Sequence, residues 1–287
     1  MTSSTTPFDE AERLKWAGLA DVYAATFARL CARTVPDLLD AAGVDGGTRV
    51  LDVGTGTGAV AVAACDRGAV VTAVDAEPDM VESAAKAAPA ADVRVALLPE
   101  LPFADGEFDA VAANFVLNHV GRPRKALAEL RRVTRPGGRI AVTIWGADAG
   151  TGQRLLGRAV AAAGALRPPE VPPLAPEEAF EQTPEGLAAL LAAAGLVDVS
   201  CTALAWDHRA TAEEWWSGAA AGVASIGRIV TAQTPETVAE IKRHYDRLSA
   251  EFASPGGDGV DGGGNGASGA GVLALPHRAL LASGRVV

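Results

Sequence analysis

The sequence is short of several residue types that mark particular classes of protein. It holds 3 Cys, 2 Met and 2 Tyr in 287 residues, and aromatic residues make up only 5% of the chain. The cysteines, Cys31, Cys65 and Cys201, are odd in number and far apart, which argues against a disulfide framework and a metal clip. The first ten residues lack the basic and then apolar pattern of a secretory signal. We therefore expect a cytoplasmic protein whose cysteines fill small spaces in the core.

Long apolar runs and clustered positive charge are also missing. No apolar run reaches the roughly 18 residues that a membrane-spanning helix needs, so we expect no membrane partner. Lys and Arg number 25 against 35 Asp and Glu, which gives a formal net charge of −10. Because phosphate backbones are bound by clustered Lys and Arg, this charge argues against a nucleic-acid partner. A composition of 49% hydrophobic and 21% charged residues is that of an ordinary globular protein.

Strands and helices alternate through the middle of the chain. Helical spacing of apolar residues over 8–42 predicts two amphipathic helices broken near 34–36. Further on, apolar runs predict strands at 49–53, 70–74, 93–97, 108–114 and 139–145, and helices at 59–67, 78–88 and 125–133. This alternation specifies right-handed crossovers between parallel strands. We predict an α/β, doubly wound (Rossmann-like) fold with a mostly parallel seven-stranded sheet, helices on both faces and a helical cap.

The second half of the chain repeats the αβ pattern once and then becomes helical. We predict a proline-rich connector at 168–176, a helix at 183–194 and a strand at 197–202. Residues 211–253 are mostly helical in pattern and are assigned to the cap, and 272–287 predict the last strand. The glycine-rich run 255–271 predicts a flexible surface loop.

The chemistry is concentrated in one glycine-rich turn. Residues 50–58, Val-Leu-Asp-Val-Gly-Thr-Gly-Thr-Gly, put an acid near the end of a strand and three glycines before a helix. Glycines let the backbone turn sharply and approach a ligand, and a helix start presents free N–H groups. Asp75 stands 21 positions beyond Gly54, at the end of the second predicted strand, where a carboxylate can accept both hydroxyls of a ribose. The pair indicates a nucleotide-like cofactor.

Two cofactor classes are compatible with the glycine spacing. Gly54-x-Gly56-x-x-Ala59 satisfies the dinucleotide fingerprint, so a nicotinamide-dependent oxidoreductase is one interpretation. Asp52 argues against it, because a negative charge is unfavourable beside a pyrophosphate and favourable beside an ammonium and a sulfonium.

The chain resembles the class I S-adenosylmethionine (SAM)-dependent methyltransferases, in particular the UbiE-like branch that acts on small molecules. The similarity covers residues 40–145. Four motifs in family order carry it: Val50-Leu51-Asp52-Val53-Gly54-Thr55-Gly56-Thr57-Gly58, Val74-Asp75 with Met80, Leu101-Pro102-Phe103 with Phe108-Asp109-Ala110-Val111, and Arg132-Val133-x-Arg135-Pro136-Gly137-Gly138-Arg139.

The resemblance implies a role for each part of the cofactor site. The backbone at Gly54, Thr55 and Gly56 would approach the methionine part of SAM, with Asp52 near its amino group. Asn114, at the end of the fourth predicted strand, would touch the same part.

The nucleoside part of SAM would lie on the second strand and the helix after it. Asp75 would bind the ribose hydroxyls, and Ala76 and Met80 would pack on adenine. Many relatives hold the adenine amino group with an Asp, but this chain has Leu97 at that place, so we expect only a backbone contact from Leu98.

The substrate would lie beside the methyl group. Tyr23 belongs to a Trp-x-x-x-Ala-x-x-Tyr pattern that is similar to the family's cofactor-covering first helix, and Asn118 and His119 would face the methyl group. His119 is our candidate catalytic base; it could instead orient the substrate, or be a helix-start histidine bound to backbone. Trp145 could line the pocket or cover the sheet edge, and Trp216 could stack on a substrate or pack cap helices.

The sequence leads to one function and two alternatives. We predict a SAM-dependent methyltransferase that moves a methyl group to O, N or C of a small molecule, such as a secondary metabolite, with S-adenosylhomocysteine as product and without a metal. The alternatives are a SAM-binding protein that regulates or catalyses cyclisation, and the nicotinamide enzyme. We expect three regions: N-terminal helices over the cofactor at 1–45, a SAM-binding core at 46–150, and cap helices with the last strands at 151–287.

Overall fold

A computed structural model of the chain describes residues 5–168, 172–254 and 271–287. The chain divides into two compact units. Unit 1 consists of Met1–Asp148, Glu170–Leu204 and Ala279–Val287, and unit 2 of Ala149–Pro169 and Ala205–Arg278. Within the described ranges, no helix is both long and apolar enough to cross a membrane.

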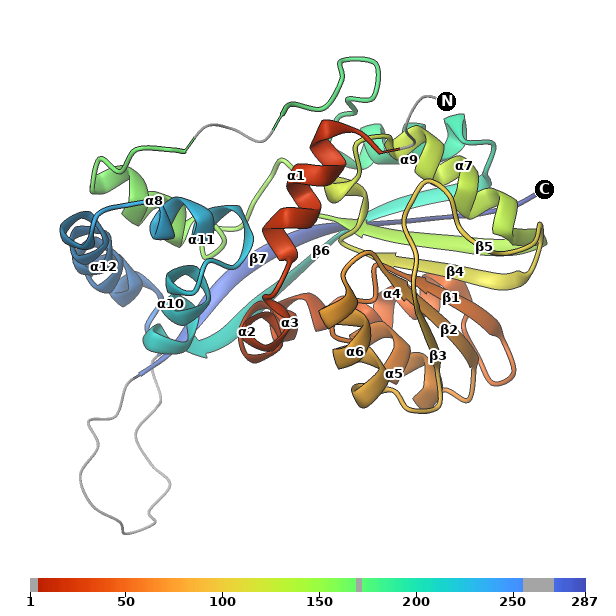
Figure 1. The fold of residues 1–287 in the computed structure, drawn as a ribbon, viewed down its shortest axis with the longest axis horizontal. Coiled ribbons are helices and arrows are strands. Elements are labelled where there is room, and N and C mark those ends of the chain that lie inside the picture. Colours follow the sequence, from red (N-terminus) through yellow and green to blue (C-terminus); the bar gives the residue numbers. More distant parts are fainter. Residues whose placement is uncertain (1–4, 169–171, 255–270) are drawn as a thin grey trace, which may run out of the picture. The chain divides into compact units, whose positions relative to one another are not determined.

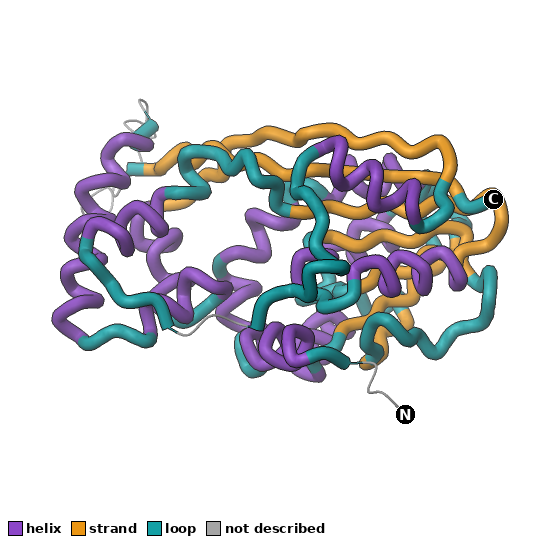
Figure 2. Tube along the Cα trace, turned by 90° about the horizontal axis from the view of Figure 1, so that it is seen from above, coloured by secondary structure: helices purple, strands orange, loops and turns teal. Residues whose placement is uncertain are grey.

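In the described residues, seven strands form one sheet in the order β3-β2-β1-β4-β5-β7-β6. Figure 2 draws the strands in orange. Their bounds are β1 Arg49–Val53, β2 Val70–Asp75, β3 Asp92–Val95, β4 Phe108–Asn114, β5 Thr134–Ile144, β6 Val197–Thr211 and β7 Val272–Arg285. Neighbouring strands from β3 to β5 pair in parallel, whereas β7 pairs antiparallel to β5. The predicted seven strands and parallel centre are confirmed, but the sheet as a whole is mixed.

Helices of unit 1 cover both faces of this sheet (Figure 1). One face packs on α7 (Pro123–Val133) and α9 (Pro184–Ala193), through residues such as Leu127, Leu130 and Leu187. The other packs on α4 (Val35–Ala42) and α5 (Ala59–Asp66). Because side chains alternate along a strand, Leu51 of β1 enters the first core and Val50 the second. The helix α6 (Pro78–Ala87) follows β2.

The N-terminal segment is more broken than its apolar spacing predicts. It forms α1 (Pro7–Trp16), α2 (Ala20–Ala25), α3 (Phe27–Ala32) and then α4. Gly18, at φ 73°, separates the first two, and Thr26, at φ −124° and ψ −94°, separates the next two. The prediction of two helices is therefore wrong, although the break expected near 34–36 is present.

The region expected to form cap helices is largely helical. Unit 2 contains α8 (Leu155–Ala162), α10 (Ala212–Ala220), α11 (Ala224–Thr231), α12 (Pro235–Ser249) and the 3-10 turn η2 (Ala250–Phe252). The strand expected at 197–202 continues to Thr211, so β6 contributes residues to both units. The predicted loop at 255–271 falls almost wholly outside the described residues, as does part of the connector at 168–176.

Candidate functional site

The candidate site lies where the sheet changes its direction of winding. From β1 the chain moves outward through β2 to β3, and then returns to place β4 on the other side of β1. In sheets of this type, ligands bind beyond the carboxyl ends of the strands at that point. The residues there are Gly54 after β1, Asp75 at the end of β2 and Phe115 after β4.

The glycine turn after β1 has a backbone that side chains would disrupt. Gly54 has φ 67°, and a Cβ there would lie 2.5 Å from Cγ2 of Val116. Gly58, at φ 93°, would bring a Cβ to 3.1 Å from the Cα of Ala84 on α6. The turn therefore packs directly against the segment after β4 on one side and against α6 on the other.

Asp52 is fully buried beneath this turn. Thr55 Oγ1 donates a hydrogen bond to its Oδ2 at 2.6 Å, while Oδ1 has no hydrogen-bond partner among the described residues. Burial, with the charge of the neighbouring Asp75, raises the pKa of Asp52 to about 7 against the opposing effect of the hydrogen bond from Thr55. An orphaned buried carboxylate oxygen is rare, and it would suit a positively charged ligand group.

Asp75 is joined to the glycine turn by a hydrogen bond. The N–H of Gly56 donates to Oδ2 at 2.8 Å, and the N–H of Glu77 donates to Oδ1 at 3.0 Å. Burial raises the pKa of Asp75 although these backbone bonds oppose the shift. Each carboxylate oxygen can accept a second hydrogen bond, so a diol remains an acceptable partner.

Tyr23 of α2 lies over the glycine turn. Its Cε1 is 3.6 Å from the position that a Cβ on Gly56 would take. Its hydroxyl is hydrogen-bonded to Cys31, and burial, with the charge of Asp75 nearby, raises the pKa of Tyr23. Trp16 packs edge-on against Tyr23, with ring centroids 5.6 Å apart.

The residues predicted for adenine surround the end of β2. Met80 on α6 is buried and Ala76 is half-buried. The N–H of Ala96 donates to the carbonyl of Asp75 at 3.0 Å, which ties the segment carrying Leu98 to the same strand end. Their contact with adenine stays a prediction.

The side chain of Asn114 is used to join elements of unit 1. Its Oδ1 accepts hydrogen bonds from Thr34 at 2.8 Å and Thr143 at 2.6 Å, and its Nδ2 donates to the carbonyl of Cys31 at 3.0 Å. These bonds link β4 to β5 and to the segment between α3 and α4. A role toward the methionine part of SAM stays a prediction.

The segment after β4 carries the predicted substrate side. It begins with Phe115, which has φ 58° and stacks on Trp145 with centroids 4.1 Å apart. Asn118 Oδ1 accepts a hydrogen bond from the N–H of Trp145 at 3.2 Å. His119 ends the 3-10 turn η1 (Leu117–His119), packs edge-on against Trp16, and hydrogen-bonds Glu12 of α1 at 2.7 Å. Non-glycine residues with a positive φ are uncommon, and they cluster at functional sites.

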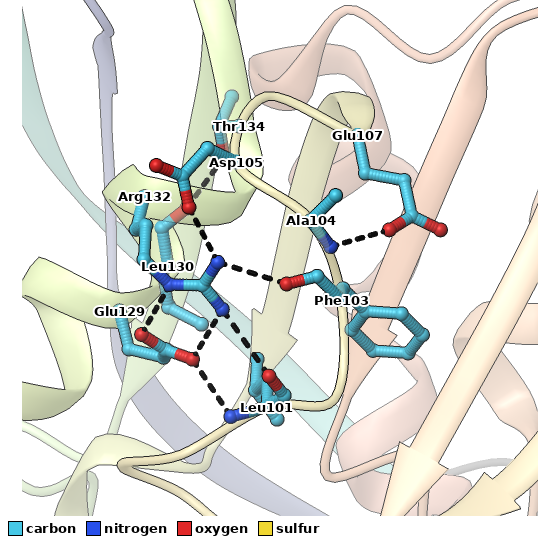
Figure 3. A network of polar contacts seen from close by, with 9 residues as sticks. All are labelled: Leu101, Phe103, Ala104, Asp105, Glu107, Glu129, Leu130, Arg132 and Thr134. Carbon is cyan, nitrogen blue, oxygen red and sulfur yellow. Dashed lines mark hydrogen bonds and ion pairs between the residues drawn. The ribbon is translucent and has the colours of Figure 1, made fainter.

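Two of the family motifs are joined by one arginine (Figure 3). The guanidinium of Arg132 donates to the carbonyls of Leu101 and Phe103, at 3.2 and 2.8 Å. It also binds the carboxylates of Asp105 and Glu129, and Glu129 in turn accepts the N–H of Leu101 at 2.7 Å. All five guanidinium N–H groups are thereby used, which fixes the loop between β3 and β4.

The remaining candidates belong to unit 2. Trp216 is buried against Tyr245, with ring centroids 5.4 Å apart, and lies near the ammonium of Lys242. His277, also in unit 2, is 1% exposed, and its Nδ1 donates to the carbonyl of Leu275. Burial lowers its pKa to about 4. The described ranges contain no group of His, Cys, Asp and Glu that could hold a metal ion.

Sequence reasoning missed three residues that build this site. Glu12 and Lys15 of α1 are buried, at 6% and 5% exposure, although an acid and a base three positions apart on a helix resemble an exposed ion pair. The conformation of Phe115 had no sequence signal.

Comparisons with known proteins agree with this geometry. The model of a family described as a methyltransferase domain matches residues 51–142. A demethylmenaquinone methyltransferase of Renibacterium salmoninarum is 43% identical over 105 residues, which are 37% of this chain and 44% of that protein. An uncharacterised protein of Mycobacterium bovis is 35% identical over 198 residues, which are 65% of this chain and 70% of that protein.

Residues 51–142 therefore match a methyltransferase domain, in agreement with the resemblance to the class I SAM-dependent methyltransferases. The likeness to the UbiE-like branch is confirmed by the demethylmenaquinone methyltransferases among its relatives. The YcgJ protein of Bacillus subtilis has a similar fold, with a TM-score of 0.52 at 20% identity over 88% of this chain and 98% of that one. The chain spans 43% to 60% of the length of the first curated relatives that it matches.

The residues present fit the cofactor of these methyltransferases. SAM carries an ammonium, a sulfonium and a ribose diol. The orphaned oxygen of Asp52 suits the ammonium, and the carboxylate of Asp75 suits the diol. Gly54 leaves no room for a side chain between the turn and Val116, so the turn packs closely against the segment after β4.

Proposed function

We propose that this chain binds SAM at the carboxyl edge of β1, β2 and β4 and transfers its methyl group to an O, N or C atom of a small molecule. The observation that carries the proposal is the junction of the glycine turn with Asp75, joined by the 2.8 Å hydrogen bond from Gly56. This junction lies within the matched methyltransferase domain.

In this proposal, different residues of the chain bind different parts of SAM. The turn at Gly54, Thr55 and Gly56 holds the methionine part, and the carboxylate of Asp52 neutralises its ammonium. Asp75 binds the ribose, and Tyr23 closes over the turn. The half-buried surroundings of Tyr23 and Trp16 exclude water from the reacting centre.

When bound, SAM supplies a methyl group on a positively charged sulfur. The sulfur keeps the bonding electron pair when the methyl group is transferred. The protein therefore contributes mainly by alignment and closeness of the two reactants. A base is needed only where the acceptor atom carries a proton at working pH.

A small molecule is the acceptor class that the chain favours. The net charge of −10 opposes nucleic acid and other polyanions. Unit 2 lies outside the matched domain. Proteins that share a fold differ in the sites built on it, and so in their substrates. We extend the proposal to a secondary metabolite as substrate.

Titration calorimetry of SAM into wild type, Asp75→Ala and Asp92→Ala tests the proposal. Asp92 is an exposed acid on the neighbouring strand β3, so its variant is the matched control. We expect Asp75→Ala to weaken SAM binding by roughly a hundred-fold or more, because two hydrogen bonds to a charged group are lost. Circular dichroism establishes that each variant is folded.

Three outcomes would contradict the proposal. Unchanged SAM affinity in Asp75→Ala would remove the ribose assignment. Binding of NAD in place of SAM would favour the oxidoreductase. Tight SAM binding without methylated product or S-adenosylhomocysteine, across a panel of phenols, amines and carbon acids, would favour a non-methylating role.

A further inference from the structure

A chain of buried or half-buried ionisable groups leads from Lys15 and Glu12 of α1 to His119. Lys15 Nζ donates to Glu12 Oε1 at 2.5 Å, and Glu12 Oε2 lies 2.7 Å from His119 Nδ1. The side chains of Lys15 and Glu12 are 4% and 7% exposed, whereas that of His119 is 30% exposed. The imidazole therefore lies at the border between this buried pair and the surface.

The protonation of Glu12 follows from its partners. Burial raises the pKa of Glu12, but the hydrogen bonds and charges of His119 and Lys15 outweigh it, so the pKa is lowered overall. Glu12 is thus a carboxylate at neutral pH and can only accept hydrogen bonds.

This carboxylate fixes the tautomer of His119. Because Glu12 only accepts, the proton of a neutral imidazole must be on Nδ1. The lone pair is then on Nε2, the nitrogen that can take a proton from another molecule. The same arrangement of carboxylate and histidine lets a histidine act as a base elsewhere in enzymology.

Two contact paths connect His119 to the glycine turn. The N–H of His119 donates to the carbonyl of Val116 at 2.8 Å, and Val116 is the residue that packs against Gly54. Independently, Trp16 packs against both His119 and Tyr23, and Tyr23 lies over Gly56. His119 is thus separated from the turn by one residue, Val116, on the first path and by two residues, Trp16 and Tyr23, on the second.

We propose that Glu12 is a positioning residue that holds His119 with its Nε2 ready to take the acceptor's proton, and that the acceptor is therefore a hydroxyl, a protonated nitrogen or a carbon acid. This inference rests on the proposed function. As the acceptor atom bonds to the methyl carbon, the bond from that carbon to sulfur breaks, its electron pair stays on sulfur, and the acceptor's proton passes to Nε2 of His119. The buried charge of Glu12 stabilises the imidazolium that results.

Nitrogen NMR of the enzyme without any ligand tests the positioning. Where the imidazole is neutral, we expect the Nδ1–H form of His119 in wild type. The chain has 4 His, so the spectrum of His119→Asn identifies the signal. In Glu12→Gln, the amide oxygen faces Lys15 and the amide NH₂ faces Nδ1, so we expect the Nε2–H form. Glu10→Gln, an exposed acid on the same helix, should leave the tautomer unchanged.

A second readout separates this inference from the proposed function. We expect Glu12→Gln to lower turnover about a hundred-fold while SAM affinity by calorimetry stays within a factor of two. An Nε2–H form in wild type would overturn the inference even if Glu12→Gln fails to fold. An unchanged tautomer in folded Glu12→Gln would overturn it too. Loss of SAM binding in wild type would instead overturn the proposed function.

Discussion

At the scale of single residues, burial decides what a carboxylate does in this molecule. Asp52 is buried with one orphaned oxygen, and its pKa is raised to about 7. Asp109 is bound by the guanidinium groups of Arg49 and Arg135, which hold its pKa well below the usual range. In the sequence, both residues are aspartates within predicted strands. Their different surroundings in the fold shift their pKa values in opposite directions.

Asp52→Asn should stabilise the protein at high pH. The folded pKa of Asp52 is raised, so the folded state retains a proton that the unfolded state loses between the ordinary value near 3.8 and about 7. Stability is therefore lost as pH rises through this window. In urea unfolding at pH 8 we expect Asp52→Asn to exceed wild type by a few kcal/mol, on the order set by the pKa difference; at pH 4 the gain should vanish.

Asp109→Asn is the matched contrast, because the pKa of Asp109 is shifted in the opposite direction to that of Asp52. The folded pKa of Asp109 is lowered, so its contribution is present above the unfolded pKa and lost as pH falls. We expect this variant to be less stable than wild type at pH 8. A destabilised Asp52→Asn at pH 8 would contradict the account of Asp52.

At the scale of elements, one face of α1 joins the helix to the segment after β4. Asp9, Glu12 and Trp16 are spaced by three and four residues and so share a face. Asp9 Oδ1 accepts the N–H of Gly121 at 2.5 Å, and the other two contact His119. A Cβ on Gly121 would lie 2.0 Å from Thr6 Oγ1 and 2.9 Å from Asp9 Oδ2.

Gly121→Ala should loosen α1. The new Cβ collides with Thr6 and Asp9, which form the capping box of α1, so we expect faster amide exchange over Pro7–Trp16 and a loss of about 1–3 kcal/mol in stability. The control is Gly157→Ala in α8, where a Cβ meets nothing within 4 Å and the helix should gain slightly. Equal exchange of α1 in wild type and Gly121→Ala would contradict this view of the docking.

Elements were predictable where local pattern and packing agree. The bounds of β1 and β4 follow from apolar runs that lie in the core on both faces. Strand β6 continues beyond its predicted end at 202 to Thr211, and its alternating burial runs through Asp207, His208 and Arg209. The glycine turn and Asp75 could be found because their spacing is local. The burial of Glu12 could not, because its partner His119 is 107 positions away.

At the scale of the whole molecule, the two units do not follow the order of the chain. Unit 1 takes three segments and includes α9. The expected regions 1–45, 46–150 and 151–287 stay a prediction. A compact unit is defined by contacts between residues that can lie far apart in the sequence. The family match on 51–142 lies wholly within unit 1 and includes the glycine turn. The proposed cofactor site is accordingly a property of unit 1.

A crystal structure of the protein with S-adenosylhomocysteine would test the central claim most directly. We predict ribose hydroxyls within hydrogen-bonding distance of Asp75, an amino group beside Asp52, and the sulfur between the turn at Gly54 and His119. The product bound elsewhere, or a pyrophosphate-containing cofactor found in the turn instead, would contradict the account.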